Sequence, residues 1–328
     1  TFAENQAPAP NDFINTSFGG VVLGEMTYRL SNKIVNNRSR GFKRQMSEVI
    51  ALLINPMNGI NRIIDGKWGR VSRNTTERDS SKVSAEFDIG IRRFDKNTAN
   101  LLKHGKFGGY GRAKLIYGTP YEDYKVPFSN IVINTEFGQD DSSKLNMVSV
   151  YGSLAGWAMR TNDKVRHLAV LSANYDYIHN EAFSYGGQSV KINLFSEFKL
   201  PKSIKINTAF GAGPVLLAAV PDDYRYKGRT YDYVTGVSIS ASGGINIANK
   251  FYGSIDYRGG WLVTVNGNAS HYFLHALSSE FRYAIDDRFS VGIAPGYFTL
   301  EGKYNDYPDV NKEYPFLRVS GRYTVQFK

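Results

Sequence analysis

The sequence predicts an all-β transmembrane fold: an antiparallel outer-membrane β-barrel of about 12 strands, preceded by an N-terminal helical module. Three observations predict it. From about residue 82 to the last residue, stretches of alternating polarity follow one another, separated by turns. The turns alternate between short and long, as in single-chain outer-membrane barrels. The 328 residues contain no run of 18 or more apolar residues, so the sequence offers no transmembrane helix.

The last stretch shows the alternation most clearly. In residues 317–327 the odd positions are apolar, aromatic or Gly, and the even positions are Arg, Ser, Arg, Thr and Gln. Because successive side chains of a strand point to opposite faces, one face is apolar and the other hydrophilic. A strand with lipid on one side and a polar lumen on the other is built in this way.

The same pattern places twelve strands. Their predicted centres are Phe87, Ala113, Ile133, Val150, Leu171, Leu194, Ile206, Ile239, Ile255, Ala276, Ile293 and Arg322. Short links are expected at 161–163, 201–202, 248–249 and 286–287, and longer loops around 96–108, 179–187, 221–230 and 302–313. An even strand number then puts both chain ends on the short-turn, periplasmic side of a bacterial outer membrane. Residues 119–127 form a long turn on that side and do not fit the pattern.

Composition narrows the class further. Aromatic residues make up 14% of the chain, with 22 Tyr and 20 Phe, which suits interfacial girdles around a half-polar barrel. Cysteine is absent, which excludes disulfides and thiolate chemistry. The net charge of +10 is spread over strands and loops beside acids, so we expect contact with anionic lipid rather than nucleic acid. The N-terminus reads as processed or trimmed.

Opposite faces of the strands carry different side chains. The outward set is apolar and includes Phe87, Ile89, Ile192, Leu194 and Ile293. The inward set is charged: Glu86, Asp88, Arg112, Glu136, Arg166, Glu197, Asp256, Arg258, Glu280, Arg282, Arg318 and Arg322. Acids and bases across a narrow lumen are expected to pair and close it. A selective pore lined by the excess positive charge, and a small acid–base site, are the alternatives.

Residues 1–81 do not alternate and are expected to form the helical module, either on the periplasmic side or as a plug in the lumen, and residues 82–328 are expected to form the barrel. Asn11 and Asp12 can cap a helix over residues 13–35, in which Gly20 and Gly24 stand four apart and allow a close backbone approach. A basic turn at 38–44 precedes a helix over 45–54. Pro56 should end or kink it, Asn58 and Gly59 signal a turn, and 60–65 form a short helix.

Enzyme signatures are weak in this chain. His275 and Ser279 share the lipid-facing parity of one predicted strand, and they are the only candidates for a hydrolytic pair. Four residues of strand separate them, which is too far for a direct hydrogen bond, and no nucleophile elbow is present. The loop acids Asp140, Asp141, Asp222 and Asp223 are interpreted as solvated rather than as calcium ligands. We therefore expect no catalytic residue, metal or cofactor.

The N-terminal module carries one recognisable signature, in residues 19–31, 38–42 and 54–62. It resembles a domain of unknown function found in outer-membrane proteins of Bacteroidota-type bacteria. The resemblance implies an outer-membrane barrel with a signature at its periplasmic start, and no activity. The signature residues Gly20, Gly24, Glu25, Tyr28, Arg29, Asn55, Pro56, Asn58, Asn61 and Arg62 are interpreted as a surface that locks the module to the barrel or docks another protein.

Three functions remain open. The first is a non-enzymatic scaffold, or an accessory subunit of an outer-membrane assembly or export complex. A narrow pore or transport channel is the alternative, and a lipid-modifying outer-membrane enzyme is the third. The expected partners are outer-membrane lipids and lipopolysaccharide, and other outer-membrane or periplasmic proteins, but not nucleic acid.

Overall fold

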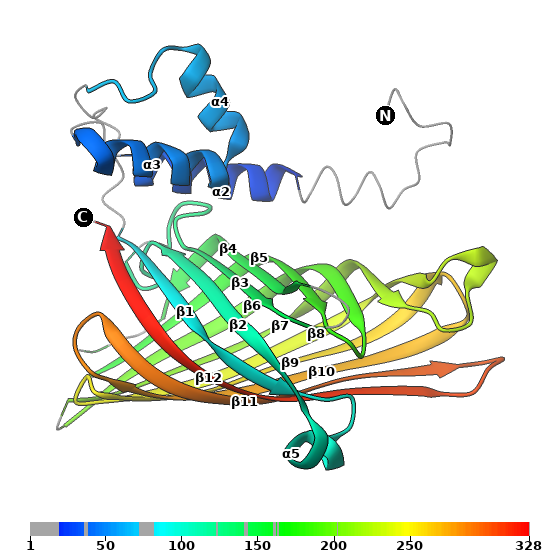
Figure 1. Cartoon of the computed structure of the whole chain (residues 1–328). Helices are drawn as coiled ribbons and strands as arrows, with labels where there is room; N and C mark the ends of the chain where they lie inside the picture. The colour runs from blue at the N-terminus through cyan, green and yellow to red at the C-terminus, as the bar shows by residue number, and fades with distance from the viewer. Residues whose placement is uncertain are drawn as a thin grey trace.

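The computed structural model describes residues 20–35, 39–71, 82–122, 124–140, 144–159, 162, 164–201 and 203–327. Twelve antiparallel strands close into a barrel, in which β1 pairs with both β2 and β12 (Figure 1). The strands are β1 (Val83–Phe94), β2 (Lys106–Tyr117), β3 (Ile131–Gly138), β4 (Leu145–Ala158), β5 (Val165–His179), β6 (Ser184–Leu200), β7 (Ile204–Pro221), β8 (Tyr231–Ile247), β9 (Phe251–Asn266), β10 (Ser270–Ala284), β11 (Phe289–Tyr304) and β12 (Val310–Phe327). Closure leaves no strand edge unpaired.

All twelve predicted strand centres lie in these strands, and the predicted strand number is confirmed. Most strands are longer than predicted, because ladder pairing continues past the apolar stretch. The loops predicted at 179–187 and 302–313 are therefore reduced to 180–183 and 305–309. We call the end with the connections 201–203, 248–250 and 285–288 the short-turn end, and the opposite end the long-loop end. Short helices η2 (Thr98–Asn100), α5 (Leu101–His104) and η3 (Tyr226–Gly228) lie in long-loop connections.

The ladder register separates the two faces of the wall. Among outward positions of the twelve strands, acidic residues, Lys and Arg occur only at Arg93, Glu301, Lys303 and Glu313. All four lie toward the long-loop end. Toward the short-turn end the outward surface is an apolar band, with large exposed side chains at Ile89, Ile192, Phe210, Ile239, Ile255, Phe281 and Ile293.

Aromatic side chains border this band. At the short-turn end Phe251 lies 5.1 Å from Tyr283, and Phe289 lies 4.8 Å from Tyr323, between ring centroids. On β9, Trp261 stacks on His271 ten residues beyond Phe251. Ten residues of a tilted strand span about 25 Å along the barrel axis, which is the height of a bilayer's hydrocarbon region.

The N-terminal segment folds into α2 (Gly20–Ile34), α3 (Gly41–Ile54) and α4 (Pro56–Ile64). Pro56 ends one helix and begins the next, because Asn55 is extended and its side chain accepts a hydrogen bond from the Asn58 amide. The predicted turn at Asn58 and Gly59 is wrong, since both lie inside α4. Gly59 is needed for close packing: a Cβ there would lie 2.8 Å from the Cα atom of Leu52 on α3.

The described part of the helical module, residues 20–35 and 39–71, lies outside the barrel, over the wall that carries β1 to β5 (Figure 1). Met26 and Leu30 of α2 are buried against a set of outward side chains near the short-turn end. That set is Val83, Tyr117, Ile131 and Val150. The described helices therefore cover the outer wall, and the expectation of a plug inside the lumen is wrong for them.

The long turn after β2, which did not fit the predicted pattern of short and long connections, packs against α2 as well. The connection 118–130 brings Phe128 against the same cluster, beside Gly152 and Met26. A short turn could not reach there, which accounts for the length of this connection. No helix among the described residues is long and apolar enough to cross a membrane. Several residues named in the sequence predictions lie outside the described residues. They are the predicted helix cap at Asn11 and Asp12, and Gly19, Arg38, Asp141, Thr161, Asp163 and Lys202.

Candidate functional site in the barrel lumen

The lumen holds a cavity of about 1640 Å³. It is lined at one end by turn residues of the short-turn end, including Asn249, Lys250 and Asp287, and it continues along the inward faces of the strands. Among its deeper lining residues are Ile178 and Phe298. The cavity therefore enters the barrel from the short-turn end and stops against apolar side chains.

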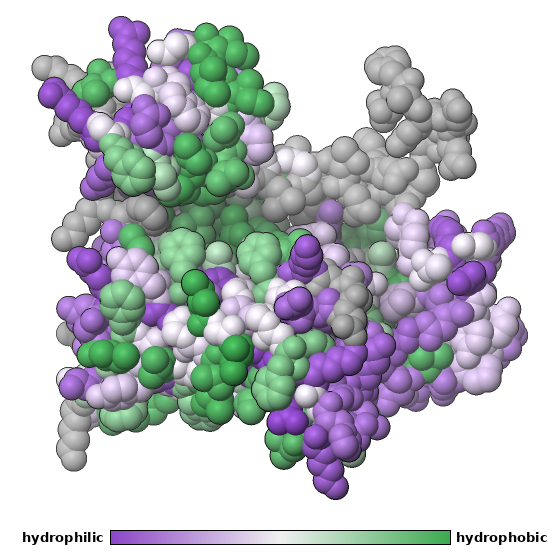
Figure 2. Space-filling view, in the orientation of Figure 1, coloured by the Kyte–Doolittle hydropathy of each residue, from purple (hydrophilic) through white to green (hydrophobic). Residues whose placement is uncertain are grey.

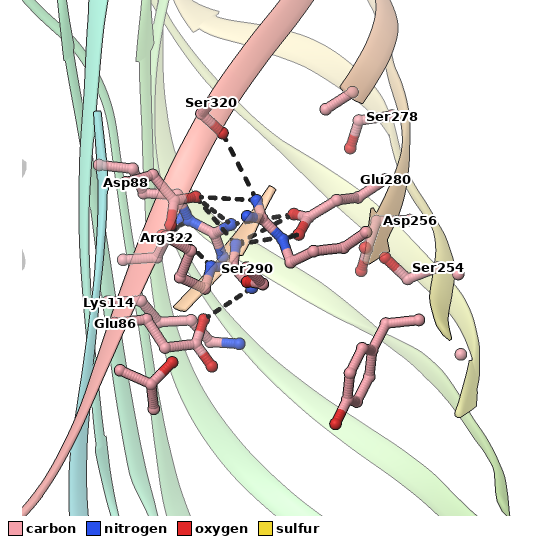
Figure 3. A pocket seen from close by; sticks show the side chains of 18 of the residues that line it. Glu86, Asp88, Lys114, Ser254, Asp256, Ser278, Glu280, Ser290, Ser320 and Arg322 are labelled. Atoms are coloured by element: carbon pink, nitrogen blue, oxygen red, sulfur yellow. Dashed lines mark hydrogen bonds and ion pairs between the residues drawn. The ribbon is translucent and has the colours of Figure 1, made fainter. Parts of the chain in front are cut away.

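An ion-pair cluster narrows this cavity (Figure 3). The arginine cluster, as we call it, comprises Arg112, Arg282 and Arg322 with Glu86, Asp88 and Glu280. Arg322 has the most partners: its guanidinium lies 2.6 Å from Asp88, 3.2 Å from Glu86 and 3.0 Å from Glu280. Arg112 lies 3.2 Å from Glu280, and Arg282 lies 3.4 Å from Asp88.

The arginine cluster crosses the lumen rather than following one strand. Arg112 is on β2 and Glu280 is on β10, with β1, β12 and β11 between them around the wall. Each guanidinium keeps at least two carboxylates in reach, which distributes the cost of holding charges away from bulk water. The cluster thus ties together four strands, β1, β2, β10 and β12, and sets the width of the cavity at this level.

Two further pairs bridge other parts of the wall. Arg258 of β9 donates to Asp176 of β5 at 2.7 Å, and Lys191 lies 4.0 Å from the same carboxylate. Arg318 of β12 lies 2.7 Å from Glu136 of β3. Side chains of opposite charge that are far apart in the sequence therefore meet inside the barrel, as pairing of the inward charges predicts.

Ten of the twelve predicted lumen charges line the cavity: Glu86, Asp88, Arg112, Glu136, Asp256, Arg258, Glu280, Arg282, Arg318 and Arg322. Arg166 and Glu197 face each other across the β5–β6 ladder and are not among the lining residues. Lys114 and Asp256 line the cavity without an ion pair to another described residue. The predicted closure of the lumen by ion pairs alone is wrong, because the paired charges leave the cavity between them.

Apolar side chains close the other half of the lumen. We call them the lumenal apolar cluster; it consists of Phe94, Ile178, Phe183, Tyr185, Val215, Ala218, Val220, Val234, Leu262, Tyr272, Leu274, Ala276, Phe298, Leu300, Tyr304, Tyr314 and Phe316. Phe298 and Phe316 pack edge to face with centroids 5.0 Å apart. Tyr272 donates a hydrogen bond to Asp232 at 3.0 Å, which satisfies its buried hydroxyl. The cluster joins side chains of nine strands across the interior at the long-loop half.

Sequence reasoning missed this cluster. The signal was present, since Tyr314 and Phe316 share the inward parity of Arg318 on β12. On β11, Phe298 and Leu300 likewise share the parity of the inward Ser290. Extending this parity along β11 and β12 to the long-loop end would have shown that the inward face changes from charged to apolar.

Two of the loop acids, Asp140 and Asp222, are not solvated as predicted, whereas Asp223 is exposed. Asp140 is buried, accepts a hydrogen bond from the hydroxyl of Tyr314 and lies 3.8 Å from Arg92. Asp222 is buried and accepts hydrogen bonds from the amides of Tyr224 and Tyr226. These carboxylates hold the long-loop end together, because each accepts bonds from groups that would otherwise be buried without partners.

The signature residues of the module fall into two groups. Asn58 donates to Ser31 and Asn32, and Asn55 donates to Thr27, so these amides join α4 to α2. Glu25 pairs with Arg29 along α2 at 2.7 Å, while Tyr28 and Asn61 are exposed. At Gly20 and Gly24 an added Cβ would meet no described atom within 4 Å, so the expected close backbone approach is not found.

Arg62 belongs to a buried charged group inside the module. Glu48 lies 2.7 Å from Arg44 and 2.8 Å from Arg62, and no part of its side chain is exposed. Burial favours the neutral carboxyl, but the hydrogen bond and charge of Arg62 and the charge of Arg44 outweigh it, so the pKa of Glu48 is lowered. Arg44 and Glu48 were not among the predicted site residues, because only the folded module shows which helix face is buried.

The two candidate hydrolytic residues do not meet. The Nδ1 atom of His275 lies 2.7 Å from the hydroxyl of Tyr257 on β9. Ser279 is one outward position beyond Leu277 on the same strand, opposite Ile255. The structure therefore pairs the histidine with a tyrosine, not with the serine.

Comparison with known proteins adds a family for the N-terminal segment. Residues 1–57 match the model of a family described as a domain of unknown function, DUF3943. This bears out the resemblance of the signature to an uncharacterised domain. No curated protein matches the chain.

Several solved outer-membrane barrels are similar at low identity. The NanC porin is 11% identical with a TM-score of 0.36, over 71% of this chain and 98% of that one. The TodX monoaromatic hydrocarbon channel is 7% identical with a TM-score of 0.33, over 76% and 91%. OmpT of Vibrio cholerae is 9% identical with a TM-score of 0.30, over 75% and 98%. Likenesses at this level carry no inference about function, which must come from the lumen and the surface of this chain.

Proposed function

We propose that this protein is an outer-membrane channel whose lumen is closed at its long-loop half in the conformation described. The membrane setting is supported by the apolar band of the outer wall, its aromatic borders and the confinement of outward charges to the long-loop end. Since the strands continue past this band, the long-loop end extends beyond the bilayer. The start of β1 and the end of β12 lie at the short-turn end, which faces the periplasm.

The observation that carries the proposal is the cavity. At about 30 Å³ per water molecule, 1640 Å³ holds about 50 waters. A scaffold does not require a hydrated lumen, whereas a channel for polar solutes does. Water in the cavity also reduces the free-energy cost of keeping charged side chains in the lumen. The arginine cluster and Lys114 can therefore present fixed charges to a solute in the cavity.

Opening must then involve the lumenal apolar cluster, because it occupies the half of the lumen that the cavity does not reach. The test is planar-bilayer conductance of a variant in which Phe94, Phe298 and Phe316 are all replaced by Ala. We expect at least tenfold more time-averaged current than in the wild type, whose openings are rare or small. Phe281→Ala, which removes an exposed phenylalanine from the outer wall, is the matched control and should leave the current unchanged.

Folding of each variant is checked by heat-modifiable migration on gels before current is recorded. A folded triple variant that conducts no better than the wild type would remove the channel from consideration.

A second function, a scaffold or accessory subunit of an outer-membrane assembly, is supported by a different observation. The module of residues 1–81 is expected to act as one unit, and its described helices lie on the outer wall, where another protein could reach them. Extraction in mild detergent followed by native mass measurement tests it: a defined larger assembly favours the scaffold, and a single barrel favours the channel.

A further inference from the structure

Helix α3 buries its charged face and exposes its apolar one. Arg44, Glu48 and Ala51 are buried. Phe42, Met46, Val49 and Leu53 are exposed, and their spacing of four, three and four residues places them on a single stripe of the helix. A helix packed in water would show the opposite arrangement, because apolar side chains gain free energy by leaving water and charged ones lose it.

Helix α4 also exposes apolar side chains. Met57, Ile60, Ile63 and Ile64 are exposed, with Ile64 at 76% and Met57 at 67% of their full accessibility. Phe42 and Leu53 of α3 reach 81% and 75%. Figure 2 shows green apolar side chains on the outer side of the module as well as where it meets the barrel. We call these eight exposed side chains, four from each helix, the module's apolar surface.

The place of the module on the barrel indicates what covers this surface. Met26 and Leu30 seat α2 on Val83 and Tyr117, the outward residues nearest the short-turn ends of β1 and β2. Along β1 the next exposed outward residues are Phe87 and Ile89, which belong to the apolar band. The module is therefore anchored where the apolar band begins, at the depth of the bilayer's short-turn-side leaflet.

Charge supports a lipid surface as the occupant. In residues 39–71 the basic residues are Arg40, Lys43, Arg44, Arg62, Lys67 and Arg70, against the acids Glu48 and Asp65. Glu48 and Asp65 pair within the module, while Arg40 and Lys43 are exposed at the start of α3. Exposed cations beside an exposed apolar stripe match anionic phospholipid, whose headgroups and acyl chains meet them at the same depth.

We propose that the module's apolar surface is inserted into the short-turn-side leaflet of the membrane, among anionic phospholipids, alongside the barrel wall. This inference rests on the proposed membrane-spanning function. The buried group of Arg44, Glu48 and Arg62 then forms the polar interior of a unit whose outside is in contact with acyl chains, and α2 acts as the bridge between that unit and the barrel.

Single-cysteine labelling tests the proposal, since the chain has no cysteine of its own. The full-length Leu53→Cys variant is labelled with the fluorophore NBD and reconstituted in vesicles of phosphatidylcholine and phosphatidylglycerol. Doxyl-labelled phosphatidylcholine quenches a fluorophore in lipid, and iodide quenches one in water. Ile255→Cys, on the apolar band, is the lipid control, and Asp287→Cys, in the β10–β11 turn, is the water control.

We expect Leu53→Cys to be quenched by doxyl lipid at least threefold more strongly than by iodide, as Ile255→Cys is, with Asp287→Cys behaving in the opposite way. Iodide quenching at Leu53 with lipid quenching at Ile255 would overturn this proposal and leave the membrane barrel standing. Protection of Leu53 from both quenchers would also overturn it, in favour of coverage by protein. Iodide quenching at Ile255 would instead remove the membrane-spanning function itself.

Discussion

Ile255 lies near the middle of the stretch between Phe251 and Trp261 on β9, so an arginine there should lie close to the centre of the bilayer. Its side chain is outward and about half exposed on the apolar band. The neighbouring residue, Ser254, points into the lumen, lines the cavity and sits across the ladder from Glu280. The variants Ile255→Arg and Ser254→Arg therefore place the same side chain one residue apart on opposite faces of one strand.

The expected cost differs between the two faces. An arginine facing lipid at the midplane destabilises a barrel by about 2–4 kcal/mol, and the effect falls toward zero near the interfaces. Since about 1.4 kcal/mol corresponds to a factor of ten, a central value of about 3 kcal/mol lowers the folding equilibrium roughly a hundredfold. In the cavity the new guanidinium stays hydrated and near a carboxylate, so Ser254→Arg should change stability by no more than about 0.5 kcal/mol.

Equilibrium urea unfolding from unilamellar vesicles, followed by tryptophan fluorescence, measures this difference. Ile255→Arg should shift the unfolding midpoint to lower urea with an unchanged slope, and Ser254→Arg should leave it near the wild-type value. Equal losses in the two variants, or no loss in Ile255→Arg, would show that the face assignment or the depth of β9 is wrong.

Three further predictions concern the module and the outer wall. Although burial raises the pKa of Glu48, the hydrogen bond and charge of Arg62 and the charge of Arg44 hold it below its ordinary value of 4.5. The contribution of Glu48 to stability is therefore complete above about pH 4.5 and is lost as the pH falls through the lowered value. Hydrogen exchange of α3 and α4 should accelerate in that acid range, and Glu48→Ala should accelerate it at pH 7 by removing about 3–5 kcal/mol, with no effect on the barrel strands. A side chain at Gly152 would collide with Met26, so Gly152→Val should release α2 and expose it to proteolysis while the barrel stays folded. The wild type and the variants His275→Ala and Ser279→Ala should all leave the lipids of reconstituted membranes chemically unchanged, as measured by mass spectrometry, because His275 pairs with Tyr257 and not with Ser279. Lipid hydrolysis by the wild type that either variant abolishes would contradict this.

The strand pattern of the barrel could be predicted because period-two alternation is a local property. Residues 317–327 contain their own inward and outward sets, and closure preserves those sets without changing them. The same holds for the inward position of Arg322 or Glu280. Which acid pairs with which base could not be predicted, since Arg112 and Glu280 lie 168 residues apart and meet only when the barrel closes.

Sequence alone thus determined the fold class, the strand number, the apolar outward face and the charged half of the inward face. Tertiary structure decided where the lumen is open and where it is closed, because side chains such as Phe298 and Phe316 meet only across a closed interior. It also decided that the helices lie on the outer wall, since Met26 packs against strands that are far from it in the sequence. Finally, it decided that α3 buries its charged face. The amphipathic pattern of the helix does not say which face is buried, and the ion pair of Glu48 with Arg62 of α4 decides it.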